Sequence, residues 1–145
     1  MNIPAKDIAN LLGGRKHLGR TVTSSRELEL VIGGGIPKAS LDNLLRLFAD
    51  QTNYTQSALR HLIVAPATYK RSQKFNIQVS GTIERIARLF AIAKEAFGTE
   101  SAASQFLLSK HPELGGRAPF EVALTEVGGR SVEEIIEKGL HGIPV

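Results

Sequence analysis

The 145-residue sequence predicts an all-α fold, and three observations support this prediction. Apolar residues recur at helical spacing in most segments, as they do in Leu41, Leu44, Leu45 and Phe48. Capping residues, prolines and glycine clusters separate these segments from one another. Strand-like alternation is confined to Phe75–Val79, which is short and isolated.

The composition excludes several classes of protein. Cys is absent, which excludes disulfides, Cys-ligated zinc and a thiol nucleophile. No run of 18 apolar residues predicts a membrane span, and residues 1–16 lack the pattern of a secretory signal. We therefore expect a cytoplasmic protein with no membrane partner.

The net charge of +4 is unevenly distributed along the chain. Residues 1–80 carry 11 Lys and Arg against 5 Asp and Glu, and residues 81–145 carry 7 against 9; the two halves sum to 18 and 14. A basic first half and a slightly acidic second half suggest different partners, although chance variation of charge is the alternative.

The first third of the chain predicts three helices. A weak helical pattern covers Ile3–Leu12 and ends at a glycine pair. Arg15, Lys16, His17 and Arg20 follow in a segment expected to be a flexible arm, solvated or touching phosphates. Ser24 or Ser25 caps a helix that ends at the glycines 33–35, and Pro37 begins the next helix, which reaches Phe48.

A helix-turn-helix candidate follows. Thr55 caps a helix to Ile63, and Pro66 opens a second short helix, Ala67–Phe75. The second helix has a polar outer face suited to base edges and phosphates, so its exposed residues are the predicted DNA contacts: Thr68, Lys70, Arg71, Gln73 and Lys74. The alternative is a pair of surface helices with solvated lysines.

The longest predicted helix starts at a cap, Ser80, and ends at Gly98. It is apolar around most of its circumference, so it must be buried inside the domain or across a dimer contact. We expect Ile83, Ile86 and Phe90 to form that dimer contact.

The C-terminal segment contains two Gly-Gly-Arg triplets, residues 115–117 and 128–130. Thr99 caps a helix to Leu108, a short helix covers Pro119–Glu126, and Ser131 begins the last helix. Backbone N–H groups at such glycines can bind an anion, but we favour the interpretation that both pairs end helices with positive φ.

Nothing in the sequence predicts catalysis. The four histidines have no metal-ligand spacing, and neither HExxH nor GxSxG occurs. Glu133, Glu134 and Glu137 are expected on the solvated outer face of the last helix. We expect no enzyme, no catalytic residue, no metal and no cofactor.

The C-terminal segment closely resembles the toxin-binding domain of the Xre/MbcA/ParS family of antitoxins. The resemblance rests on Phe106-Leu107, His111-Pro112, Leu114-Gly115-Gly116, Pro119-Phe120-Glu121-Val122, Thr125-Glu126, Gly128, Val132 and Gly142. Upstream, residues 67–71 resemble that family's Xre-like helix-turn-helix, and residues 83–89 and 96–98 its central helix. Leu12-Gly13-Gly14 and Gly35-Ile36-Pro37 also fall in the family order. Many members have Trp where this chain has Phe106, which retains an aromatic anchor but lacks the indole N–H.

This resemblance implies an N-terminal arm (1–23), a helix-turn-helix DNA-binding domain (24–79) and a small helical toxin-binding domain (80–145), joined through a long central helix. It also implies two partners: a RES-domain, NAD-degrading toxin encoded by the adjacent gene, and operator DNA. We expect a homodimer as well, because helix-turn-helix proteins usually read paired half-sites and the helix from Ser80 to Phe97 has more apolar surface than one small domain readily hides.

We expect the C-terminal helix and tail to cover the toxin's active site. An apolar tail has little reason to end a soluble domain unless it packs somewhere, and Pro144 stiffens it. The predicted toxin-binding residues are Glu133, Glu137, Leu140, His141, Ile143, Pro144 and Val145. One alternative is that the tail packs on its own domain. A different class of function is a stand-alone helix-turn-helix repressor whose C-terminal domain only dimerises.

Overall fold

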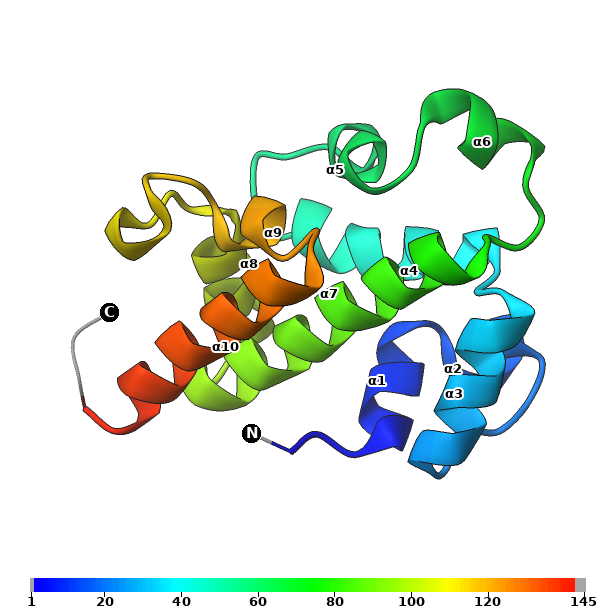
Figure 1. Cartoon of the computed structure of the whole chain (residues 1–145), viewed down its shortest axis with the longest axis horizontal. Helices are drawn as coiled ribbons and strands as arrows, with labels where there is room; N and C mark the ends of the chain where they lie inside the picture. Colours follow the sequence, from blue (N-terminus) through cyan, green and yellow to red (C-terminus); the bar gives the residue numbers. More distant parts are fainter. Residues whose placement is uncertain (1, 143–145) are drawn as a thin grey trace.

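The computed structural model describes residues 2–142, which form ten α-helices and one short 3-10 helix (Figure 1). Two isolated bridges are the sole β-type pairings in this part of the chain, which confirms the all-α prediction. The elements are α1 (Ala5–Leu11), α2 (Gly14–Leu18), α3 (Ser25–Gly34), α4 (Lys38–Ala49), α5 (Gln56–Ile63), α6 (Pro66–Arg71), α7 (Ile77–Phe97), α8 (Glu100–Leu108), η1 (Pro112–Leu114), α9 (Pro119–Val122) and α10 (Glu126–Leu140).

The longest helix, α7, runs through the middle of the molecule, and α1, α3, α5, α8 and α10 pack against it (Figure 1). Asn76 caps it by accepting a 2.9 Å hydrogen bond from the Val79 N–H. The prediction that Ser80 caps α7 is wrong, because Ser80 lies inside the first turns and is fully buried. Its hydroxyl accepts a 2.9 Å hydrogen bond from the Ile36 N–H and donates to the Phe75 carbonyl. Ser80 therefore ties α7 to the segment before α4.

One continuous cluster of buried apolar side chains extends from Ala5 to Ile136. Its centre is a group of three rings from distant segments: Phe48 of α4 meets Phe90 of α7 at 5.1 Å and Phe120 of α9 at 5.3 Å, both edge-on. The predicted domain boundary between residues 79 and 80 falls inside α7, and the core continues across it.

The predicted dimer contact is corrected by the burial of its residues. Ile83, Ile86 and Phe90 are at most 1% exposed in the single chain. They point into the shared core, so they offer no surface to a second copy. The apolar circumference of α7 is covered by other helices of the same chain.

The segment expected to be a flexible arm is instead helix α2. Gly13 and Gly19, on either side of it, have φ of +92° and +76°, which glycine adopts without strain. A Cβ at Gly13 would lie 1.9 Å from the His17 ring, so only glycine leaves room for this imidazole. The Asn43 side chain donates a 2.9 Å hydrogen bond to the Leu11 carbonyl and so joins α4 to the end of α1.

Helix α6 is shorter than predicted, because it ends at Arg71 rather than Phe75. The backbone turns extended at Ser72, and residues 73–75 pair with residues 36–38. The Lys38 N–H donates to the Gln73 carbonyl at 3.1 Å, and the Phe75 N–H donates to the Ile36 carbonyl at 3.0 Å. These pairings across the chain compete successfully with another helical turn.

Candidate functional site

The C-terminal site is built on α10, which begins earlier than the sequence suggested. Thr125 is its cap and accepts a 3.1 Å hydrogen bond from the Gly128 N–H. The helix therefore starts at Glu126, not at Ser131, and Ser131 lies inside it. The second Gly-Gly-Arg triplet is consequently helical, which corrects the interpretation that both glycine pairs end helices.

The two helical glycines permit close packing instead. A Cβ at Gly128 would lie 1.8 Å from the Val122 carbonyl oxygen, at the end of α9. A Cβ at Gly129 would lie 2.7 Å from the Cδ of Arg85. The start of α10 thus approaches α9 through Gly128 and α7 through Gly129, and a larger residue at either position must displace its neighbour.

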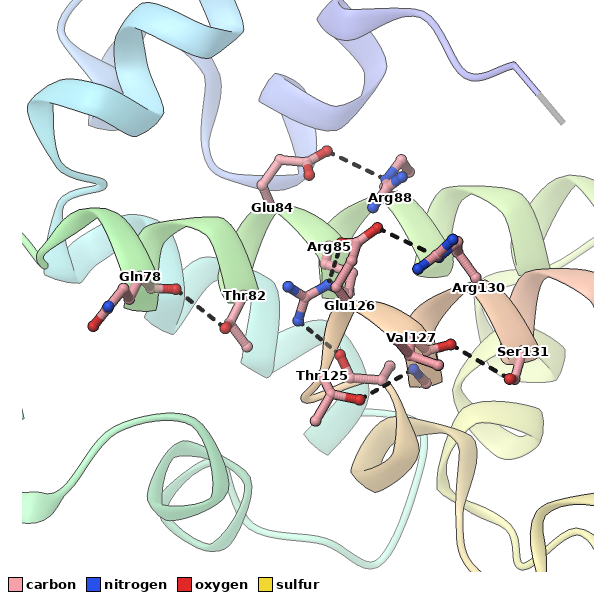
Figure 2. Close-up of polar contacts among 12 residues, drawn as sticks. Gln78, Thr82, Glu84, Arg85, Arg88, Thr125, Glu126, Val127, Arg130 and Ser131 are labelled. Carbon is pink, nitrogen blue, oxygen red and sulfur yellow. Dashed lines mark hydrogen bonds and ion pairs between the residues drawn. The ribbon is translucent and has the colours of Figure 1, made fainter.

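Arg85 of α7 fixes this arrangement (Figure 2). Its Nη1 donates a 3.0 Å hydrogen bond to the Ala123 carbonyl, and its Nε lies 3.4 Å from the Glu126 carboxylate. Glu126 also lies 4.0 Å from Arg130, one turn further along α10. Arg85 therefore binds the end of α9 and the start of α10 together. This role of Arg85 could not be predicted from the sequence, because a charged residue on a long helix is usually solvated.

The first Gly-Gly-Arg triplet does form the predicted turn. Gly115 and Gly116 have φ of +68° and +77°. The turn closes where the His111 N–H donates a 3.1 Å hydrogen bond to the Arg117 carbonyl. The ring of His111 also packs against Phe106, which keeps the aromatic anchor expected there.

The predicted toxin-binding residues lie in three different environments. Leu140, 44% exposed, and His141 are at the solvent-exposed end of α10. Glu133 and Glu137 are half-buried, so the prediction that they lie on a solvated face is wrong. Glu133 also lines a groove bounded by α1, α3 and α7. Ile143, Pro144 and Val145 lie outside the described residues. Val127, 66% exposed, is an apolar residue on α10 that the sequence analysis did not select.

Glu84 lies in the same groove as Glu133. Burial raises the pKa of Glu84, and the nearby Arg88 and Arg85 guanidinium groups oppose that rise. Its carboxylate is 3.5 Å from Arg88 Nε (Figure 2). A carboxyl group with a raised pKa in a cleft is a candidate acid, but here it belongs to an ion pair one helical turn apart on α7.

The N-terminal site is the pair α5 and α6, which meet at the two residues Val64 and Ala65. None of the residues of α6 is fully buried, and Tyr69, which packs against the edge of the core, also makes polar contacts that hold the helix in place. The Tyr69 hydroxyl donates to the Asp42 carboxylate of α4 at 2.8 Å, and Arg60 of α5 lies 3.6 Å from the same carboxylate. Burial, followed by the Asp42 carboxylate, raises the pKa of Tyr69, so the phenol stays protonated and able to donate.

Two cations also lie over the Tyr69 ring: the Arg60 guanidinium at 4.1 Å and the Lys38 ammonium at 4.6 Å. Tyr69 is therefore the residue through which α4, α5 and α6 are joined. This cluster could not be predicted from the sequence, because Arg60 and Tyr69 follow Lys38 by 22 and 31 residues.

The predicted DNA contacts are only partly on α6. Lys70 and Arg71 are exposed there, and Thr68 is half-buried. Gln73 and Lys74 are exposed but lie in the extended segment after the helix, which corrects their placement on a recognition helix.

Residues 2–142 contain neither a metal-binding cluster nor a helix that could span a membrane. No group of three or more His, Asp or Glu side chains there is arranged to hold a metal ion. In the same part of the chain, none of the helices combines the length and apolar character needed to cross a membrane.

Comparison with known proteins identifies the C-terminal site. Residues 93–142 match the family model of the antitoxin Xre/MbcA/ParS C-terminal toxin-binding domain. The match runs from the last turn of α7 through α10, and thus contains the Phe120 anchor, the Thr125 cap and both close-packed glycines. No curated protein matches the chain. The match confirms the resemblance seen in the C-terminal segment: residues 93–142 are similar to the toxin-binding domain of Xre/MbcA/ParS antitoxins, and the residues before them lie outside the match.

Proposed function

We propose that this antitoxin neutralises a RES-domain, NAD-degrading toxin by covering its active site, and that it represses the shared operon through α5 and α6. The observation that carries the toxin part is the match of residues 93–142 to a toxin-binding domain. The RES type of the toxin follows from the resemblance of the chain to antitoxins of that pairing.

The shape of α10 supports a role in presenting the C-terminal end to another protein. The helix is held at its start by Thr125, by Gly128 and by Arg85. Its other end carries the exposed Leu140, directly before the tail. A helix that is already fixed loses little conformational entropy when it binds, so more of the contact energy contributes to affinity.

Deletion of residues 140–145 tests the toxin part. Leu140 and His141 are exposed, so removing them opens no core, and helicity measured by circular dichroism should be unchanged. Cells that also express the adjacent toxin should lose growth and NAD. Deletion of residues 143–145 alone separates the tail from the end of the helix. Full protection by the 140–145 deletion would contradict the proposal.

Co-purification with the product of the adjacent gene separates this proposal from a stand-alone repressor. A stable complex with silenced NAD consumption is expected. If the two proteins do not associate, the alternative of a repressor whose C-terminal domain only dimerises is favoured.

The DNA part is supported by α6, which exposes Lys70 and Arg71 while Tyr69 holds the helix to α4. Arg71→Ala should weaken binding to the promoter of the operon, and binding should fall with added salt. Lys110→Ala, a change of equal charge at an exposed position after α8, is the matched control. Equal affinities of these two variants would count against α6 as the DNA-contacting helix.

Helix-turn-helix proteins usually read paired half-sites, so we propose that the DNA-bound form is a homodimer. Its contact must lie outside Ile83, Ile86 and Phe90, which are buried. Sedimentation equilibrium should give twice the monomer mass; a monomer at every concentration would exclude this part of the proposal.

A further inference from the structure

Two long stretches of the sequence contain no acidic residue. One lies between Asp7 and Glu27 and the other between Asp50 and Glu84. The second stretch contains the α5–α6 pair and therefore the proposed DNA contacts. The first contains α2 with Arg15 and Lys16, for which the function proposed above gives no role.

The fold places both stretches against α4. Helix α2 packs on α4, and α6 is joined to α4 through the hydrogen bond from Tyr69 to Asp42. Between α2 and α5 the surface is hollowed by a cavity of about 250 Å³. The hollow is lined by one residue of α2, one of α5 and four of α4: His17, Gln56, Ala39, Asp42, Asn43 and Arg46.

The charge in and around this hollow is positive. Arg46 is exposed at its edge, and one of its five N–H donors is used in a 2.9 Å bond to Asn43. Asp42 is the acid among the lining residues, and its charge is offset by Arg60 at 3.6 Å. Arg20 lies 3.6 Å from Glu27 and is therefore already paired. Arg46 lines the hollow, and the exposed Arg15 and Lys16 precede His17, the α2 residue that also lines it.

The backbone that carries the α2 cations is helical, whereas the backbone of a flexible arm would have no defined course. Gly13 and Gly19, which have positive φ, set the direction of the chain before and after α2, and the His17 ring fills the space beside Gly13. Because this backbone is already ordered, phosphate contacts by its side chains require no further loss of backbone conformational entropy, and such contacts orient a protein on a duplex without reading its sequence.

We propose that Arg15, Lys16 and Arg46 form a second contact with DNA, in which they bind backbone phosphates beside the segment contacted by α6. This inference rests on the proposed DNA binding and extends it from one short helix to a surface spanning α2, α4 and α6. The contact adds affinity and orientation but no base specificity.

Fluorescence anisotropy with two labelled duplexes tests the proposal, one from the promoter region of the operon and one scrambled duplex of equal length and composition. The test variant is Arg15→Ala with Lys16→Ala, which keeps good helix formers in α2. The control is Lys94→Ala with Lys110→Ala, which removes the same charge from exposed positions near α8. Affinity is measured from 50 to 200 mM salt, and circular dichroism verifies folding.

Each lost phosphate contact lowers the slope of log affinity against log salt by about 0.9, so the test variant should lose about 1.8. Between 50 and 200 mM salt, the factor by which affinity falls should therefore be roughly 12 times smaller for the test variant than for the control variant. Its preference for the promoter duplex should remain, whereas Arg71→Ala should reduce that preference.

Two results would overturn the proposal. If the α2 variant follows the control while Arg71→Ala weakens binding, the second contact is refuted and the proposed DNA binding by α6 stands. If the unmodified chain binds neither duplex, both proposals fail together.

Discussion

Replacement of Gly128 by alanine probes the contact that holds the start of α10 against α9. The added Cβ would lie 1.8 Å from the Val122 carbonyl oxygen, whereas real Cβ atoms keep at least 3.0 Å. The obstacle is backbone, which cannot rotate away as a side chain can. The start of α10 must therefore move by more than 1 Å (3.0 minus 1.8) relative to α9.

The expected cost can be worked out from the contacts at this point. Overpacking typically costs about 1–3 kcal/mol, and loss of the Thr125 cap costs about 1 kcal/mol. Alanine is more favourable than glycine inside a helix by about 1 kcal/mol, which offsets part of this cost. The net destabilisation is about 2 kcal/mol, which for a chain of this length lowers Tm by about 8 °C.

Two other glycines are the controls, measured by urea unfolding with circular dichroism. Gly81 is also helical but has open space around its Cβ position, so Gly81→Ala should stabilise the protein by up to about 1 kcal/mol. Gly129→Ala meets the flexible side chain of Arg85 and should fall between the other two. If Gly128→Ala is as stable as Gly81→Ala, the close approach of α10 to α9 does not exist.

Three further predictions concern the rest of the fold. Arg85→Ala should lower the free energy of unfolding by about 2 kcal/mol and weaken toxin binding, because charged hydrogen bonds of this kind contribute about 1.5–3 kcal/mol; equal toxin affinity would refute its positioning role. Phe48→Ala should cost about 3–5 kcal/mol, measured by urea unfolding, and a loss below 1 kcal/mol would contradict its central place in the core. Hydrogen bonds from Thr23 lower the pKa of Glu27 in the folded protein, so between the folded and unfolded pKa values the unfolded chain binds more protons and stability falls as the pH drops. Glu27→Gln should flatten the dependence of stability on pH in this range, and an unchanged dependence would exclude the contact.

Local chemistry explains which predictions from the sequence were confirmed. Ser24, Thr55 and Thr99 each accept a hydrogen bond from the N–H three residues later, as a helix cap does. Such a contact depends only on neighbouring residues, so the residue type and its position are sufficient to predict it.

The wrong predictions concern residues whose partners are distant in the sequence. Ser80 has the side chain of a cap but binds Ile36, 44 residues away. Gly128 and Gly129 looked like a helix end, yet they are glycines because Val122 and Arg85 lie against them. The type of each residue indicates that it forms a hydrogen bond or allows close packing. Only the packing of the helices shows which residue is its partner.

The sequence by itself determined the all-α class, most of the helix spacing and the antitoxin character of the C-terminal part, since periodicity, caps and the ordered motifs are all written along the chain. The tertiary structure alone decided that Arg85 holds α10 to α7, that Tyr69 holds α6 to α4, and that the supposed arm is helix α2, which packs on α4. These contacts join residues 9 to 41 positions apart, counting from Tyr69 back to Arg60 and from Arg85 to Glu126. Their existence depends on how helices pack around one core, which no short stretch of sequence specifies.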